Sequence, residues 1–143
     1  TLLIALGFVL FISCGPARKS VSETSGVKQS GIEMKVFPER NGGAPQTLDL
    51  TIKNNTGEVI QFGANYSIER RDGNNWTEVD LGNFAVIAIM YVLQPGDSGD
   101  YKINLFTENV KYPEGDYRVV KQISVGEKDM QPYYAGFRII EPM

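Results

Sequence analysis

The chain has 143 residues, of which 42% are hydrophobic, which suits a single domain with a sizeable core. The net charge of −3, with both signs interspersed, provides no basic surface for nucleic acid, so we expect no nucleic-acid partner. Histidine is absent, which excludes the commonest general base, the commonest metal ligand and every Ser–His or Cys–His nucleophile.

The chain begins with an unbroken uncharged run from Leu2 to Ile12. A run of about a dozen apolar residues is too short for a bilayer, which needs roughly 20, and fits the apolar region of a signal peptide. Because the sequence opens on Thr1 and lacks a basic leading segment, we expect this peptide to be truncated at its start. Residues 1–13 are therefore assigned to a signal peptide.

Four residues at the end of this run, Phe11-Ile12-Ser13-Cys14, resemble the lipobox of bacterial lipoproteins. The resemblance implies that Cys14 carries lipid, that the preceding peptide is removed and that the membrane is a partner through this lipid. Gly15 is not the aspartate that retains lipoproteins in some inner membranes. The expected location is extracytoplasmic, on the periplasmic face of an outer membrane or outside a single-membrane cell. An ordinary secretory signal with an incidental cysteine, or a buried apolar strand, is the alternative.

A tether follows the cysteine. The stretch from Arg18 to Gly31 is rich in Ser, Gly and Lys and has almost no large apolar residues. A flexible chain of this length has ends on the order of 20 Å apart, which would keep the domain close to the membrane. Residues 14–31 are assigned to the lipidated cysteine and the tether.

From residue 32 onward the hydrophobic period becomes two, which indicates strands. Leu48, Leu50 and Ile52, for example, alternate with polar residues. Short strands with turn signals at regular spacing and no helical period predict an all-β fold for residues 32–143: an immunoglobulin-like antiparallel β-sandwich of about seven to eight strands. The expected strands are 32–36, 48–52, 59–70 (broken near Gly63), 76–79, 84–93, 101–105, 117–125 and 134–140.

The stretch from Tyr112 to Val120 predicts a tyrosine corner. Pro113 and Gly115 turn the chain just before Tyr117. In β-sandwiches a tyrosine placed in this way folds its ring into the core and bonds its hydroxyl to upstream backbone.

Several motifs together carry a family resemblance. They are Leu48-x-Leu-x-Ile-x-Asn54-Asn55-Thr-Gly, the stretch from Gly63 to Glu69, Asp72-Gly73-x-x-Trp76, Leu93-x-Pro-Gly96, Pro113-x-Gly-x-Tyr117-Arg118-Val-Val-Lys121 and Tyr134-Ala-x-Phe137. In order and spacing they resemble the bacterial immunoglobulin-like domains of small lipoproteins, over about residues 32 to 141. The resemblance implies an Ig-like sandwich outside the cytoplasm and supplies no catalytic residue. We expect Trp76 to form part of the core.

Phe84 to Leu93 is apolar at every position except Tyr91, and does not alternate as a half-solvated strand should. Two interpretations remain open. The segment is buried on both faces, or it exposes Ile87, Ile89 and Tyr91 as a partner interface.

Other side chains favour structural roles. The carboxylates lie on expected turns or on polar strand faces, so we expect no enzyme activity. Asp97 to Asp100 and Asp72 to Asn75 offer oxygen ligands but lack the length and closing Glu of a calcium loop, so we expect no metal and no cofactor.

The predicted function is a membrane-anchored lipoprotein whose non-catalytic domain binds or scaffolds an envelope protein or glycan. One alternative is a proteinase inhibitor that acts through a rigid loop at 41–45 or 126–132. Another is a glycan-binding module. Its aromatic platform would draw on Tyr66, Trp76, Tyr91, Tyr133 and Tyr134.

Overall fold

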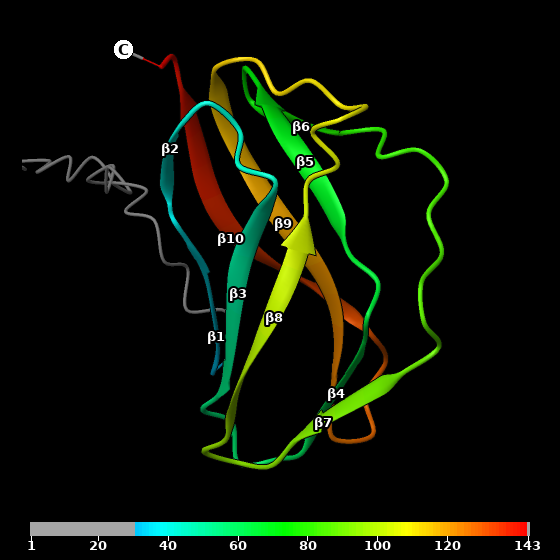
Figure 1. Cartoon of the computed structure of the whole chain (residues 1–143). Helices are drawn as coiled ribbons and strands as arrows, with labels where there is room; N and C mark the ends of the chain where they lie inside the picture. Colours follow the sequence, from blue (N-terminus) through cyan, green and yellow to red (C-terminus); the bar gives the residue numbers. More distant parts are fainter. Residues whose placement is uncertain (1–30, 143) are drawn as a thin grey trace, which may run out of the picture.

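The computed structural model describes residues 31–142 and shows an all-β fold (Figure 1). The signal peptide, Cys14 and the tether lie outside the described residues, so their assignments remain predictions. Within residues 31–142, no helix has the length and apolar character needed to cross a membrane. The ten strands are β1 (Ile32–Phe37), β2 (Arg40–Gly42), β3 (Thr47–Asn54), β4 (Ile60–Gly63), β5 (Ser67–Asp72), β6 (Asn75–Glu78), β7 (Met90–Leu93), β8 (Ser98–Asn104), β9 (Gly115–Val125) and β10 (Gln131–Ile140).

The strands form two sheets that pack face to face as a sandwich (Figure 1). One sheet has the order β1-β3-β8. The other runs β2-β10-β9-β4-β7, and β5 joins it by pairing with β9 and with β6. The predicted Ig-like sandwich is therefore confirmed. The strand number is higher than predicted because β2 was not expected and because the broken strand divides into β4 and β5.

The core lies between the sheets and follows the period-two pattern of the sequence. In β3 exposed and buried residues alternate from end to end, with Leu48, Leu50 and Ile52 pointing inward. Tyr117 and Ile123 of β9 face them from the opposite sheet and are also buried. Each fully buried Leu or Ile contributes about 1.5–3 kcal/mol, and a slip of one residue would turn the whole set to solvent.

Between β1 and β2 the chain passes from one sheet to the other. β2 pairs in parallel with the end of β10, so residues 40–42 are a short strand where the sequence indicated a loop. The Asn41 side chain is buried and donates a hydrogen bond from Nδ2 to the Pro38 carbonyl at 3.0 Å. This strand was not predicted because three residues are too few to show a period.

β4 and β5 lie along the same edge of β9 and are separated by a bulge. Phe62 pairs with Ile123 and Ser67 with Val120, so residues 63–66 oppose only two residues of β9. The break predicted near Gly63 is confirmed. One of the two opposing residues is Lys121, which is buried and donates from Nζ to backbone carbonyls of the bulge.

Trp76 does not lie in the core, so this expectation was wrong. It sits on β6, which pairs only with β5 among the described strands, and its ring is half-buried. The Arg118 guanidinium covers the ring, with its carbon 4.1 Å from the ring centroid. The reason is the strand register: Trp76 lies on the same face of the sheet as Arg118, and this face points away from the opposite sheet.

Candidate interaction surface

Residues 80–89, here called the strap, connect β6 to β7 without joining either sheet. Figure 1 shows the strap running along the outer side of the sandwich. The predicted strand at 84–93 is therefore limited to its last four residues, and the interpretation in which this segment is buried on both faces was wrong. A continuous apolar run has no period that would separate a strand from an extended loop.

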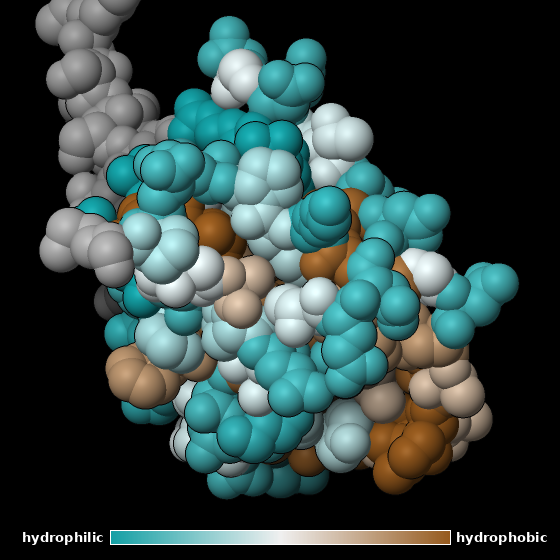
Figure 2. Space-filling view, turned by 45° about the horizontal axis from the view of Figure 1, so that its top comes forward, coloured by the Kyte–Doolittle hydropathy of each residue, from teal (hydrophilic) through white to brown (hydrophobic). Residues whose placement is uncertain are grey.

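Five exposed apolar side chains on the strap and β7 form what we call the apolar patch. Figure 2 shows apolar surface concentrated at one edge of the molecule, on the side where Figure 1 places the strap. Such contiguous apolar surface is typical of interaction sites. The members of the apolar patch are Val86 (45% exposed), Ile87 (72%), Ile89 (43%), Met90 (56%) and Val92 (49%).

The start of the strap is held by aromatic packing. The Phe84 ring lies 4.7 Å from that of Phe106 and 5.9 Å from that of Tyr66, measured between centroids. Tyr66 in turn donates from its hydroxyl to the Asn104 carbonyl at 2.8 Å and accepts from the Asn104 amide at 3.1 Å. Burial raises the pKa of Tyr66, so its hydroxyl stays protonated. The strap is thereby fixed to both sheets at this end.

The other end of the strap is fixed by β7. Met90 pairs with Gly63 of β4, and the Tyr91 ring packs inward, 5.6 Å from the Phe62 ring and 4.9 Å from the Tyr101 ring. Of the predicted interface residues, Ile87 and Ile89 are thus exposed, whereas Tyr91 supports the patch from beneath.

Sequence reasoning chose Tyr91 and missed Met90 and Val92 because it assumed one regular strand. In the structure the Ile89 amide donates to the Ile87 carbonyl at 2.8 Å, which makes a three-residue turn. This turn shifts the alternation, so even-numbered residues of β7 face outward. The apolar residues just before Pro95 are typical of a strand and could have predicted the position of β7. The tight turn before them has no sequence signature.

β7 also has a free edge. Within the described range, residues 31–142, it pairs with β4 alone and ends its sheet on that side. Edge strands are usually protected by charged residues, proline or a bulge. β7 has the sequence Met-Tyr-Val-Leu and contains no charged residue and no proline.

Along the chain, the charged residues on both sides of the patch have a single sign. No Lys or Arg occurs between Arg71 and Lys102, a stretch that includes β6, the strap and β7. β4, the neighbour of β7, has no charged residue either. The patch is therefore an uncharged centre with acidic flanks. The acidic residues of the stretch are Asp72, Glu78, Asp80, Asp97 and Asp100.

A groove of about 370 Å³ lies beside the first part of the strap. It is lined by Tyr66, Ser67, Phe84 and residues 78–82, which include the carboxylates of Glu78 and Asp80. The groove therefore joins apolar and acidic surface at one end of the patch.

The aromatic residues considered for glycan binding do not form one row. Tyr66 and Tyr91 pack inward, and Tyr133 is buried. Trp76 and Tyr134 share the outer face of the larger sheet, but the Arg118 guanidinium lies between their rings, 4.1 Å and 3.8 Å from the two centroids. Arg118 is itself held by Glu69 at 2.6 Å. This guanidinium covers one face of each ring.

The two loops considered for proteinase inhibition are shorter than predicted. Asn41 belongs to β2, and the Gly43 amide donates to the Ile140 carbonyl, which fixes the start of the first loop to the sheet. The second loop ends where β10 begins, at Gln131. Its first residue, Gly126, donates from its amide to the Val59 carbonyl at 2.8 Å.

The carboxylates considered for calcium make internal hydrogen bonds. Asp97 Oδ2 accepts from the Gln94 amide at 3.2 Å, and Asp100 Oδ1 accepts from the Thr51 hydroxyl at 2.7 Å. In the described part of the chain, no group of three or more Cys, Asp or Glu side chains is arranged to hold a metal ion.

One comparison with known proteins agrees with this fold. A family model described as a bacterial Ig-like domain matches residues 28–137. Comparison with curated protein sequences found no match.

Two similar solved structures are crystal structures of a beta-glucosidase from Listeria innocua. A mutant in complex with laminaribiose is 17% identical with a TM-score of 0.34; the match covers 80% of this chain and 16% of that one. The enzyme in complex with gluconolactone is 18% identical with a TM-score of 0.33, and the match covers 80% and 17%. The chain thus spans less than a fifth of the length of these proteins, and so weak a likeness carries no argument about its activity.

Proposed function

The chain belongs to the bacterial Ig-like domain family, and from this premise we propose that it is a membrane-anchored lipoprotein whose Ig-like domain is a non-catalytic binding module of the cell envelope. The observation that carries the binding role is the apolar patch on the strap and β7. The lipid anchor rests on the sequence around Cys14.

The anchor would be a lipid on the Cys14 thiol, supported by the apolar run before it and by the lipobox resemblance. Two or more acyl chains give durable membrane binding where one chain is marginal. The tether would then hold the domain on the extracytoplasmic side, at the inner leaflet of the outer membrane in a diderm cell.

The binding role follows from the energetics of exposed apolar surface. Ile87 is 72% exposed and Met90 56%, and no charged side chain interrupts residues 84–93. Each apolar side chain that a partner covers contributes up to about 1.5–3 kcal/mol. The anchored domain is therefore proposed to bind another envelope protein through this surface.

The anchor is tested by detergent partition. The chain would be produced behind a complete lipoprotein signal peptide that keeps residues 11–14, as wild type and as Cys14→Ser. We expect wild type in the detergent phase with a mass increased by acyl chains, and the variant in the aqueous phase. Equal partition of the two proteins would contradict lipid attachment at Cys14.

The binding role is tested by capture from envelope extract with the mature chain in detergent. Ile87→Ser and Ile89→Ser would be compared with Phe37→Ser, since Phe37 is an equally apolar residue on β1 and is 71% exposed. A protein lost with the two strap variants and kept by the control supports the proposal. A captured protease that is independent of the patch would favour the inhibitor alternative, and a captured glycan the glycan-binding one. No captured component would contradict a binding role.

A further inference from the structure

We propose that the apolar patch and the free edge of β7 bind an extended polypeptide segment as an added β-strand, and that this segment has an apolar centre flanked by Lys or Arg. The inference rests on the proposed function and specifies the chemistry of the partner.

The backbone of β7 provides the first argument. In a strand, successive residues direct their amide and carbonyl groups to alternate edges, and β4 uses only one edge of β7 through the pairs from Ile60–Leu93 to Gly63–Met90. The backbone groups of the other edge are available to an incoming strand. Recognition by strand addition uses these groups for affinity and the adjacent side chains for specificity.

The exposed side chains of the apolar patch provide the second argument. Met90 and Val92 lie on the same outward face of β7, and Ile87 and Ile89 continue the apolar surface along the strap. An added strand would place every second side chain against this surface. That side-chain set must be apolar, because a polar one would lose hydration without gaining a partner.

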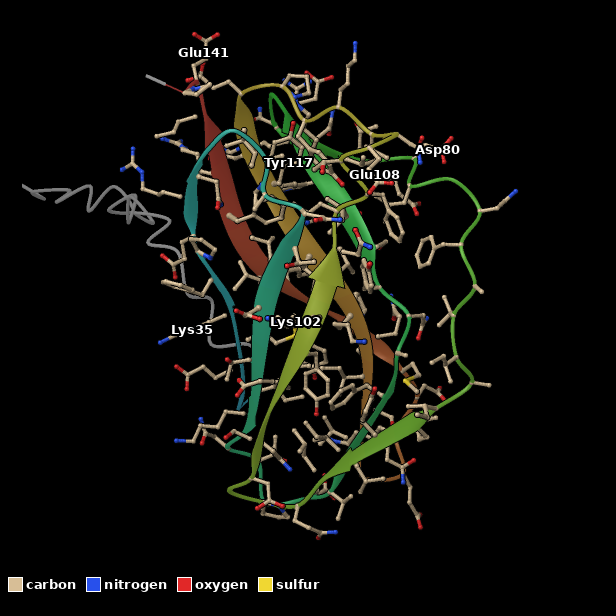
Figure 3. All side chains as sticks on the ribbon, in the orientation of Figure 1. Lys35, Asp80, Lys102, Glu108, Tyr117 and Glu141 are labelled. Carbon is tan, nitrogen blue, oxygen red and sulfur yellow. The ribbon has the colours of Figure 1, made fainter. Side chains whose placement is uncertain are left out.

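The flanking charges provide the third argument and identify the ends of the segment. Figure 3 shows the Asp80 carboxylate where the strap leaves β6, and Asp97 follows β7 in the turn to β8. Between these two residues the chain carries no charge at all. A segment with cationic residues on both sides of an apolar centre matches this pattern, and charge complementarity raises both selectivity and the association rate.

The same charges disfavour two other occupants. A second copy of the chain would bring acidic flanks against acidic flanks, and an anionic lipid surface would repel them. Both remain possible outcomes of the experiment, and either would overturn the inference.

The experiment uses the mature chain and synthetic, fluorescently labelled peptides. The probe peptide has alternating Val and Thr between two pairs of lysines. The matched control peptide has glutamates in place of the lysines. Fluorescence anisotropy would measure both at low and high salt. We expect the lysine peptide to bind on the order of ten times more tightly, with the ratio falling as salt screens the charges.

Variants of the chain test each part of the site. Ile89→Ser is expected to weaken binding of the lysine peptide by roughly tenfold, because it removes apolar contact, whereas Phe37→Ser leaves binding unchanged. Asp80→Asn is expected to weaken it about threefold, because the neutral amide keeps the acceptor that receives the Gly82 amide but loses the charge.

Backbone methylation tests strand addition. Two further lysine peptides would carry N-methyl groups on alternate residues, each blocking one edge of the peptide strand. We expect one of the two to lose binding and the other to keep it, because only one edge pairs with β7. Equal binding by both would overturn strand addition, and equal binding of the lysine and glutamate peptides would overturn the charge argument.

Two controls identify the other occupants. Analytical ultracentrifugation that showed a dimer dissociated by Ile89→Ser would identify a second copy. Patch-dependent binding to vesicles of anionic phospholipid would identify a membrane surface. If an envelope protein is captured through the patch while the peptides fail, the inference fails and the proposed function stands. If neither the capture of an envelope protein nor the binding of the peptides depends on the patch, the inference and the proposed binding role both fail.

Discussion

The ammonium group of Lys121 donates a hydrogen bond of 2.6 Å to the backbone carbonyl of Gly63, across 58 positions of the sequence. A second bond of 2.8 Å reaches the Asn65 carbonyl, so one side chain of β9 satisfies two carbonyls of the bulge between β4 and β5. Lys121 is only 3% exposed, and its Nζ lies 5.4 Å from the centroid of the Phe62 ring. Because Gly63 pairs with Met90, this lysine also supports the edge of the sheet at the apolar patch.

Stability is expected to rise between pH 7 and about pH 10. Burial lowers the pKa of Lys121 from its ordinary 10.5 to about 8. Between these two values the unfolded chain binds more protons than the folded chain, so the free energy of unfolding increases with pH. We expect a gain of about 1–2 kcal/mol in urea denaturation between pH 7 and pH 9.5.

Lys121→Met is the control for that gain. The variant should be less stable at pH 9.5, because the carbonyls of Gly63 and Asn65 lose their donor, and its stability should no longer rise in this window. An equal rise in the variant would show that other groups cause it. Above pH 10 both proteins should lose stability, because burial raises the pKa of Tyr112 and Tyr117 and the unfolded tyrosines ionise first.

Tyr117→Phe tests the tyrosine corner. The Tyr117 hydroxyl donates to the Pro113 carbonyl at 2.5 Å, while the ring packs in the core, 5.5 Å from the Phe137 ring. The variant keeps the ring and loses the hydrogen bond, so we expect a loss of roughly 1 kcal/mol in chemical denaturation. Tyr134→Phe, on the outer face of the same sheet, should change stability by less than about 0.5 kcal/mol. Unchanged stability of Tyr117→Phe would count against the corner.

Trp76→Ala tests the position of the tryptophan. A tryptophan in the core would cost about 3–5 kcal/mol when truncated to alanine. Trp76 is half-buried at the edge of the sheet and contacts Arg118, so we expect a loss of only about 1 kcal/mol. Phe62→Ala, at a fully buried position, should cost about 3–5 kcal/mol in the same denaturation experiment. Similar losses for the two variants would place Trp76 in the core after all.

Phe84→Ala tests how the strap is held. The substitution removes the ring that packs on Tyr66 and Phe106, so the amides of residues 80–89 should exchange hydrogen faster. Global stability should fall by about 1–2 kcal/mol, because the ring is half-buried. Ile87→Ala, at a position 72% exposed, should leave both measurements close to wild type. Unaltered exchange in Phe84→Ala would show that the strap does not depend on this packing.

Much of this fold was determined by the sequence itself. The alternation in β3 assigned Leu48 and Ile52 to the core, because side chains of a strand point to opposite faces in turn. The dipeptide Asp72-Gly73 is typical of a hairpin turn; β5 and β6 pair across it, and Gly73 has the positive φ of 61° that this turn requires. These features depend on neighbours in the sequence, so they can be recognised locally.

The composition of the apolar patch depends on the tertiary structure. A continuous apolar run leaves strand and loop equally open. β7 takes only four residues because its partner β4 offers four, Ile60–Gly63, and the strap is left outside the sheet. Likewise, no local pattern shows that Lys121 faces the bulge, since its partners lie on another strand. The physical reason is common to both: burial and hydrogen bonding of these residues depend on groups distant in the sequence, which only the folded chain brings together.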